Sequence, residues 1–208
     1  MLRCVIWLLA KPFLWLALGL AVSGREHLPR RGPALVAANH NSHVDILALL
    51  GAMPWRTLGR VRPVGAADYF LATPVRRFLA MRLMRGIALE RTVQRGGGDP
   101  LGPVRAALEA GDILILFPEG TRGRPEEMGP VKAGLSKLAI TCDAPVTPAY
   151  LQGAGRILPK GTRVPVPFTC SVLVGPQIAP DGDRVALMAA LAAAWEDLRA
   201  MAPPLHWH

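Results

Sequence analysis

His40 and Asp45, five positions apart, have the residue types of a general base and the carboxylate that orients it. A carboxylate that accepts a hydrogen bond from one imidazole nitrogen fixes the tautomer and stabilises the imidazolium, so the other nitrogen can take a proton. Together the two residues correspond to the base and orienter of a catalytic triad, without an evident nucleophilic side chain. The pattern therefore indicates that a substrate hydroxyl acts as the nucleophile.

The spacing restricts how these two side chains can meet. On one continuous α-helix, residues five apart point about 140° away from each other. His40 and Asp45 can approach only if His40 lies in a loop and Asp45 lies in the first turn of the following helix. The polar residues 39–43 (Asn-His-Asn-Ser-His) follow the apolar residues 34–38, which predicts this strand–loop–helix junction.

Two other interpretations of this cluster stay open from the residues alone. The polar side chains could do no more than cap a loop before a helix. His40, His43 and Asp45 could also contribute to a metal site, but such a site needs further ligands. We predict no metal, because the remaining histidines lie in unsuitable contexts, at positions 27, 206 and 208.

A second polar cluster, Phe-Pro-Glu-Gly-Thr-Arg at residues 117–122, ends the apolar run 113–117. Glu119 and Thr121 supply polar groups suited to a headgroup, and Gly120 lets the backbone approach a ligand closely. The planar guanidinium of Arg122 matches the oxygens of a phosphate. The same residues, taken alone, also fit a turn with a solvated arginine.

Short apolar runs alternate with helical patterns along the rest of the chain. Strands that are apolar throughout, with helices between them, predict an α/β fold with a mostly parallel central sheet flanked by helices. Ligand sites in such sheets lie at the carboxyl ends of strands, which is where both polar clusters fall. The predicted strands are residues 34–38, 62–66, 86–90, 113–117, 146–150 and 168–174, and the predicted helices are residues 45–50, 73–85, 99–110, 133–141 and 183–201.

The N-terminal segment is apolar from residue 4 to residue 22 except at Lys11, which Pro12 follows. A short helical hairpin that enters one leaflet fits this break best, because a spanning helix would place the lysine near mid-bilayer. A kinked spanning helix and a cleaved signal peptide are the alternatives. We therefore divide the chain into a membrane-associating helical segment, residues 1–24, and an α/β domain, residues 25–208.

The 208 residues carry a formal net charge of +9, and 51 % of them are hydrophobic. Residues 56–95 contain nine arginines against two acidic residues, Asp68 and Glu90. Such a stretch could attract anionic lipid headgroups, an acidic carrier protein or nucleic acid, or could be a solvated basic face. The three cysteines are far apart in apolar surroundings, which indicates reduced side chains rather than a disulfide framework.

The order Asn-His-x-x-x-x-Asp, followed some seventy residues later by Phe-Pro-Glu-Gly-Thr-Arg, resembles the glycerolipid acyltransferase family typified by bacterial 1-acylglycerol-3-phosphate acyltransferase. The resemblance runs from about residue 25 to residue 180. A further family motif is similar to residues 86–91, with Glu90 in place of the usual aspartate and Arg91 retained. A Phe-Lys-x-Gly element is similar to residues 131–134, with Val131 in place of phenylalanine.

This resemblance implies an O-acyltransferase in which His40 is the catalytic base and Asp45 its partner. It implies acceptor binding by Arg91, Glu119, Gly120, Thr121, Arg122 and Lys132. The implied reaction moves a fatty acyl group from acyl-CoA or acyl-carrier protein to the hydroxyl of 1-acylglycerol-3-phosphate, giving phosphatidic acid for phospholipid synthesis, without a cofactor.

The implied partners are the acyl donor, a lysolipid and an anionic membrane surface rather than nucleic acid. The expected location is the cytoplasmic face of the cell membrane, held by a monotopic or single-span N-terminal anchor. Lyso-ornithine lipid and glycerol phosphate are alternative acceptors, and a non-catalytic lipid-binding protein is a third reading.

Overall fold

Seven strands form one sheet in the order β1-β7-β6-β2-β5-β3-β4. The computed structural model describes residues 11–12, 15–90, 99–123, 128–157 and 169–204. The strands are β1 (Ala21–Ser23), β2 (Ala34–Ala38), β3 (Val61–Ala66), β4 (Ile87–Leu89), β5 (Ile113–Leu116), β6 (Val146–Gln152) and β7 (Ser171–Val174).

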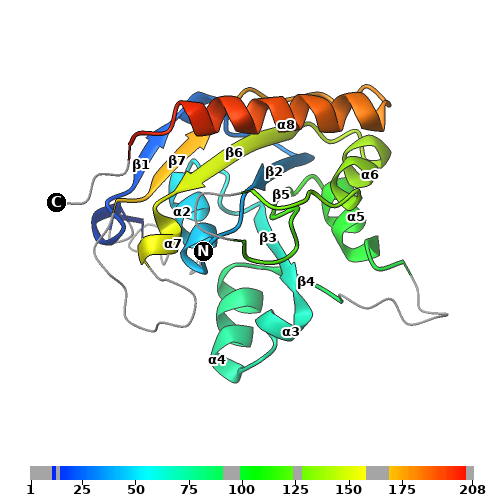
Figure 1. Cartoon of the computed structure of the whole chain (residues 1–208). Coiled ribbons are helices and arrows are strands. Elements are labelled where there is room, and N and C mark those ends of the chain that lie inside the picture. Colours follow the sequence, from blue (N-terminus) through cyan, green and yellow to red (C-terminus); the bar gives the residue numbers. More distant parts are fainter. Residues whose placement is uncertain (1–10, 13–14, 91–98, 124–127, 158–168, 205–208) are drawn as a thin grey trace.

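Helices connect most of these strands and cover both faces of the sheet (Figure 1). The longer helices are α2 (Val44–Ala52), α5 (Gly102–Glu109), α6 (Gly134–Thr141) and α8 (Arg184–Ala200). The shorter helical elements are η1 (Arg25–His27), α3 (Ala67–Phe70), α4 (Pro74–Arg77), η2 (Phe78–Leu83) and α7 (Ala154–Ile157).

The five strands β6, β2, β5, β3 and β4 run parallel to one another. Strand β7 pairs antiparallel with β6, and β1 pairs parallel with β7, so these two strands run the opposite way. The predicted fold class, a mostly parallel sheet flanked by helices, is confirmed for the described residues. The carboxyl ends of β2, β5, β3 and β4 consequently lie along one edge of the sheet, where ligand sites form in such folds.

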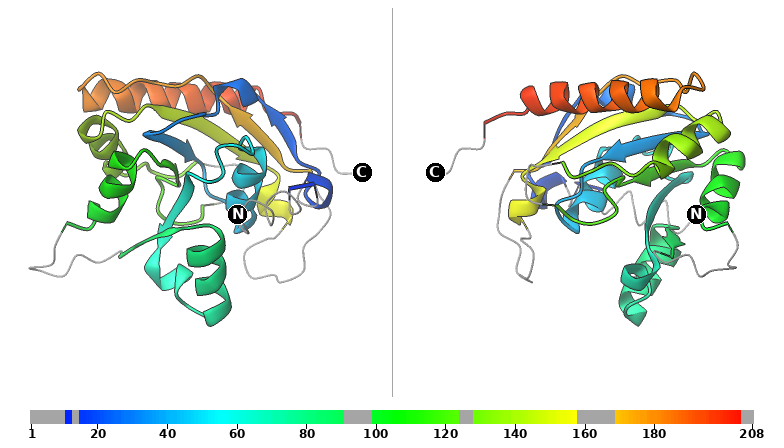
Figure 2. Two further views of the ribbon diagram at one scale, coloured as in Figure 1. Left: turned by 180° about the vertical axis from the view of Figure 1, so that it is seen from behind. Right: turned by 45° about the vertical axis from the view of Figure 1, so that its right-hand side comes forward.

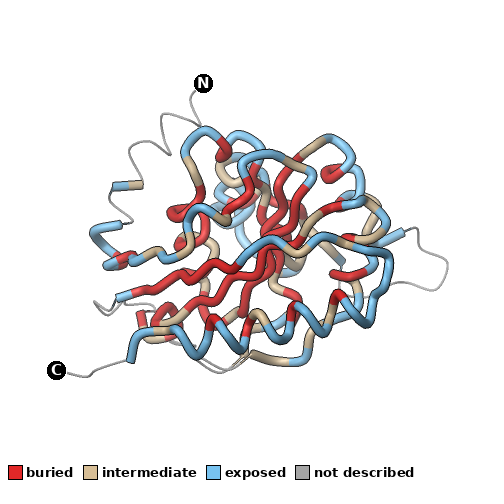
Figure 3. Tube along the Cα trace, turned by 90° about the horizontal axis from the view of Figure 1, so that it is seen from above, coloured by how far each residue is buried: buried red, intermediate tan, exposed pale blue. Residues whose placement is uncertain are grey.

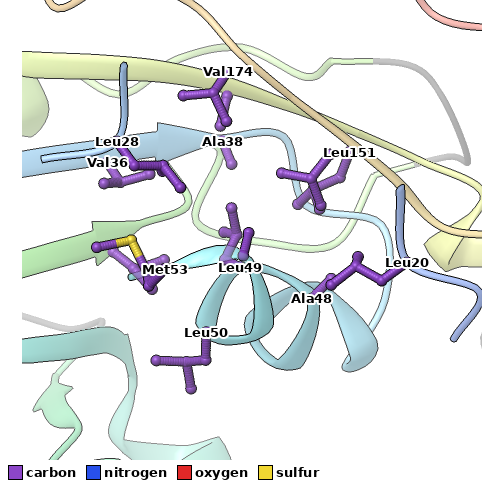
Figure 4. Packing of buried hydrophobic residues seen from close by; sticks show 14 of the residues in the cluster. Leu20, Leu28, Val36, Ala38, Ala48, Leu49, Leu50, Met53, Leu151 and Val174 are labelled. Atoms are coloured by element: carbon purple, nitrogen blue, oxygen red, sulfur yellow. The ribbon is translucent and has the colours of Figure 1, made fainter. Parts of the chain in front are cut away.

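Two hydrophobic cores lie on the two faces of the sheet, because successive side chains of a strand point to opposite sides. In β2, Leu35 contributes to the core under α5, α6 and α8, and Val36 contributes to the core under α2. Figure 4 shows Leu49 of α2 pointing toward Ala38 of β2 in this second core. Strands β2 and β5 in the centre of the sheet are buried along their length, as their uniformly apolar sequences require. Figure 3 shows this buried backbone in red through the middle of the molecule.

The segment between β3 and β4 differs in detail from the prediction of one helix over residues 73–85. Helix α4 begins after Thr73, whose hydroxyl accepts from the backbone N–H of Arg76, and it changes after one turn into the π-helical η2. With α3 it forms a helical projection at the carboxyl edge of the sheet, on the opposite side of the molecule from α8 (Figures 1 and 2).

The described part of the N-terminal segment belongs to the folded domain. Leu18 and Leu20 are buried in the core under α2, and β1 adds residues 21–23 to the edge of the sheet. Lys11 donates to the backbone carbonyl of Met53 at the end of α2. No helix within the described residues has both the length and the apolar content needed to cross a bilayer. Residues 1–10 and 13–14, on which the hairpin prediction also depends, lie outside the described residues.

Candidate active site

His40 and Asp45 meet in the strand–loop–helix junction between β2 and α2. Nδ1 of His40 lies 2.9 Å from Oδ2 of Asp45, which is fully buried in the first turn of α2. The same oxygen accepts the backbone N–H groups of Asn41 at 2.6 Å and Ser42 at 2.8 Å. These bonds hold the carboxylate in place, and the hydrogen bond from Nδ1 selects the tautomer in which Nε2 carries the lone pair.

Strand register brings the second cluster beside His40. Strands β2 and β5 are parallel neighbours in which Ala37 pairs with Leu116. His40 and Glu119 each follow three positions after that pair, so they also lie close together. The backbone N–H of His40 donates to Glu119 at 2.8 Å, and the carbonyl of His40 accepts the N–H of Gly123 at 2.9 Å. The His40 ring stacks on Phe117, with ring centroids 4.2 Å apart. The loop after β5 therefore holds the backbone and the ring of the candidate base.

Glu119 is buried behind the wall of the site rather than in it. Its two carboxylate oxygens accept the backbone N–H groups of His40 and of Gly129, the second at 3.0 Å. Burial raises the pKa of this carboxyl group, and the two backbone hydrogen bonds oppose that rise. Direct contact with an acceptor, which the resemblance implied, stays a prediction, and the geometry found supports a positioning role.

The substitution Glu119→Gln should lower both stability and activity. An amide has only one accepting oxygen, so its NH2 group must face one of the two backbone N–H donors, which costs about 1–3 kcal/mol of unfolding free energy. Displacement of His40 should lower kcat by about tenfold or more. Urea unfolding measures the change in unfolding free energy, and initial rates of the catalysed reaction measure the change in kcat. The exposed Glu196→Gln should change neither, and an E119Q variant with wild-type stability and kcat would contradict the role.

Asn39 ties the site to the opposite neighbour of β2. Its side-chain amide donates to the carbonyl of Leu151 at 2.9 Å and accepts the N–H of the same residue at 2.7 Å. Both partners are fully buried. The first residue of the polar cluster is thus bonded to β6 and has a structural contact that sequence reasoning did not assign.

A cavity of about 430 Å³ opens beside His40 at the carboxyl edge of the sheet, within the size range of ligand sites. Gly120, Thr121, Arg122 and Lys132 line it, as the prediction of a shared site requires. A Cβ at position 120 would meet the flexible end of the Lys132 side chain, and the φ of 73° at Gly120 is in the left-handed region that favours glycine. Arg91, the other predicted contact, lies outside the described residues.

The rest of the cavity wall is mostly apolar. Its residues come from β3, the helical projection, β4, β5 and α6, and they enclose the space from several sides. They include Val64, Phe70, Leu79, Ala80, Met84, Leu89, Leu116, Leu135 and Leu138. The cavity therefore combines polar side chains, including His40 and Arg122, with a mostly apolar wall, which suits an amphipathic ligand.

Sequence reasoning missed a stacked group on the polar side of this cavity. His43 stacks on Tyr69 with ring centroids 4.5 Å apart, and the guanidinium of Arg76 lies 5.0 Å from the Tyr69 ring centroid. All three residues line the cavity, and Arg76 adds a second cation to the side that holds Arg122. The sequence placed His43 in the first polar cluster, but Tyr69 carried no signal and nothing in the arginine-rich segment after β3 distinguished Arg76 from Arg77.

The pKa of His43 is lowered to about 4, chiefly by burial and then by the nearby charge of Arg122. The unfolded chain has the ordinary value near 6.5, so between pH 6.5 and pH 4 the unfolded state binds a proton that the folded state does not. Folding is therefore favoured above pH 6.5 and is progressively weakened as the pH falls to 4.

The substitution His43→Phe should reduce this loss, because phenylalanine keeps a ring against Tyr69 and cannot titrate. Full coupling of this lowered pKa to folding would be worth more than about 3 kcal/mol of unfolding free energy. Because His43 is only partly buried and solvent screens it, we expect the loss between pH 7 and pH 4.5 to be smaller in the variant by about 1 kcal/mol. Thermal unfolding at pH 7 and pH 4.5 measures the difference. Equal loss of Tm on acidification in H43F and wild type would contradict the assignment.

Comparison with known proteins identifies the family of this chain. The Acyltransferase family model matches residues 19–152. A chloroplastic 1-acyl-sn-glycerol-3-phosphate acyltransferase of Brassica napus is 32 % identical over 143 residues, 68 % of this chain and 40 % of that protein. The human 1-acyl-sn-glycerol-3-phosphate acyltransferase alpha is 28 % identical over 162 residues, 77 % of this chain and 55 % of that protein.

A solved structure shares the fold. The 1-acyl-sn-glycerophosphate acyltransferase PlsC of Thermotoga maritima superposes with a TM-score of 0.74 at 22 % identity, covering 97 % of this chain and 83 % of that one. The matched region includes both polar clusters, and the chain belongs to the Acyltransferase family. Its sequence relatives include 1-acyl-sn-glycerol-3-phosphate acyltransferases, and the chain spans 40 % and 55 % of the lengths of the two relatives given above.

Proposed function

We propose that this protein transfers a fatty acyl group from a thioester donor, acyl-CoA or acyl-carrier protein, to the hydroxyl of 1-acylglycerol-3-phosphate. The observation that carries the proposal is the 2.9 Å contact between His40 and buried Asp45 at the polar end of a largely apolar cavity that Arg122 also lines. The sequence relatives are 1-acyl-sn-glycerol-3-phosphate acyltransferases, which supports the same acceptor.

In the proposed reaction, Nε2 of His40 takes the proton of the lysolipid hydroxyl while the hydroxyl oxygen attacks the thioester carbonyl. The new C–O bond forms a tetrahedral intermediate, which breaks the C–S bond and releases the thiolate. Asp45 stabilises the imidazolium between these steps and does not itself leave the hydrogen bond to Nδ1. The proton held by His40 can then pass to the leaving thiolate.

The acceptor phosphate is proposed to bind between Arg122 and Lys132, with Arg76 as a further cation on the same cavity wall. Arginine and lysine are suited to phosphate oxygens, and an anchor remote from the reacting hydroxyl accelerates the reaction by positioning. Thr121 and the backbone of Gly120 complete this end, while Glu119 acts through the backbone of His40. Arg91 remains a proposed contact from the family resemblance.

The apolar part of the cavity is proposed to hold an acyl chain. Leu116, Leu135 and Leu138 lie on one side, and Phe70, Ala80 and Leu89 come from the projection and from β4. Both substrates carry long hydrocarbon chains, so the protein is proposed to work at a membrane. Within residues 1–24, the part that precedes buried Leu18 is proposed to associate with the cytoplasmic face of the cell membrane, because residues 18–23 pack in the folded domain.

The proposed function is tested by supplying purified full-length protein with labelled acyl-CoA or acyl-carrier protein and a panel of acceptors. The panel contains lysophosphatidic acid, lyso-ornithine lipid, glycerol phosphate and monoacylglycerol, and mass spectrometry identifies the products. We expect phosphatidic acid to be the main product and monoacylglycerol, which lacks the phosphate, to be a poor acceptor. Preferential acylation of lyso-ornithine lipid or glycerol phosphate would show that the proposed acceptor is wrong. Lipid binding without any acylated product would overturn the proposal that the protein is an enzyme.

A further inference from the structure

The helical projection presents apolar side chains to solvent. Nine large hydrophobic side chains are exposed among the described residues, and four of them lie within residues 71–79. Leu71 is 47 % exposed, Val75 68 %, Phe78 62 % and Leu79 39 %. Residues 75, 78 and 79 have the spacing that places side chains on one helical face, a face that a surface helix normally turns inward. Clustered exposure of this kind marks an interaction surface rather than scattered surface hydrophobics.

The same segment carries a dense positive charge. Arg76, Arg77 and Arg82 are exposed, and residues 69–89 contain no acidic residue. Arginine side chains can extend their charged ends toward lipid phosphates while their apolar stems lie along hydrocarbon. A surface that combines protruding apolar side chains with surrounding arginines matches the interface of an anionic bilayer in both chemistry and sign.

The surface is continuous with the mouth of the candidate active site. Arg76 and Leu79 belong to the exposed helical segment and also line the cavity beside His40. Figures 1 and 2 place the projection at the carboxyl edge of the sheet, on the opposite side of the molecule from α8. A lipid that leaves a bilayer at this surface would meet the cavity directly.

We propose that residues 71–82 form a docking surface for an anionic lipid bilayer, with Val75 and Phe78 inserted among the headgroups and the arginines against lipid phosphates. This inference rests on the proposed function, because it assigns to the same site a route for its lipid substrate. An acidic carrier protein would pair with the arginines but would leave the strongly protruding Val75 and Phe78 without a hydrocarbon phase, so the bilayer is the occupant that the observations favour.

Activity on two physical forms of substrate tests the proposal in the full-length protein. Phe78→Asp should lower the rate on lysophosphatidic acid held in anionic vesicles by about tenfold or more, because a charged side chain replaces an inserted ring. The rate on a short-chain, monomeric lysophosphatidic acid should stay within about twofold, since Phe78 does not line the cavity. The matched control is Val185→Asp, an exposed valine on α8, which should change neither rate.

Hydrogen–deuterium exchange on the unsubstituted protein provides a second measurement that does not depend on activity. Anionic vesicles of phosphatidylglycerol and phosphatidylcholine should slow exchange in residues 71–83. This protection should be greater than with vesicles of phosphatidylcholine alone, and it should weaken at high salt. Exchange in residues 184–200 should stay unchanged. The proposal is overturned by unchanged vesicle activity in F78D, by absent protection, or by protection from acyl-carrier protein but not from vesicles. If the wild-type protein acylates neither substrate form, the proposed function fails. The hydrogen–deuterium exchange measurement then still tests whether residues 71–82 dock on the bilayer.

Discussion

Replacement of His40 by alanine should reduce acyl transfer by about a hundredfold to ten-thousandfold, the range expected when a general base is removed. The ring of His40 touches the cavity and contacts Asp45 at 2.9 Å, so no other described imidazole has the same placement. The measurement is the rate of acyl transfer to lysophosphatidic acid, with lysolipid binding followed separately. We expect binding to survive, because the proposed phosphate contacts are on Arg122 and Lys132.

His27→Ala is the matched control for this substitution. His27 lies on η1, is partly exposed and does not line the cavity, so its removal should leave the rate unchanged. Circular dichroism would establish that both variants fold. Wild-type activity in H40A would end the proposed mechanism, and loss of both activity and fold would call for His40→Gln, which keeps a polar side chain beside Phe117.

Replacement of Asp45 by asparagine is expected to have the second largest effect, a loss of activity of about a hundredfold or more. The amide can keep a hydrogen bond to Nδ1, but it carries no charge to stabilise the imidazolium that forms during the reaction. In the native site one carboxylate oxygen, Oδ2, accepts from Nδ1 of His40 and from the N–H groups of Asn41 and Ser42, so the amide keeps these bonds only if its single oxygen takes that place. Unfolding free energy should fall by about 1–3 kcal/mol if the amide turns its donors toward them.

Two measurements separate this role from general destabilisation. The double variant H40A/D45N should be no less active than H40A, because the two residues act as one unit. Asp112→Asn is the control: Asp112 is also buried and is bonded to Arg62 at 3.2 Å, but it precedes β5, at the opposite end of that strand from the site. D112N should lose stability and keep its kcat, whereas equal kcat losses in D112N and D45N would contradict the assignment.

Much of the fold could be predicted because the central strands have distinctive sequences. Residues 34–38 and 113–116 are buried on both faces, and a strand in that position must be apolar at every residue. The N-terminal segment was harder to interpret. Residues 18–22 also lack polar side chains, and in the structure Leu18 and Leu20 pack in a core while residues 21–23 form β1. Apolar composition alone does not distinguish a segment that faces lipid from one that faces a sheet.

The projection between β3 and β4 shows a similar limit. The exposed apolar face of residues 75–79 has the period of a buried helix face, so sequence periodicity identified the helix but could not determine which side faces solvent. Tyr69, His43 and Arg76 come from three different elements and meet only through tertiary packing. Among them the sequence singles out only His43, as a possible metal ligand, and neither Tyr69 nor Arg76 stands out by residue type or spacing.

The sequence by itself determined the chemistry that the candidate site can perform and the sheet edge that carries it. The His40–Asp45 pair is local, so a strand–loop–helix junction is enough to bring its two groups within 2.9 Å. Only the tertiary structure decided which other residues reach that pair. Glu119 is seventy-nine positions from His40, and it supports the His40 backbone because β2 and β5 became neighbours in one register. Contacts of that kind depend on strand order, which no local pattern of residues encodes.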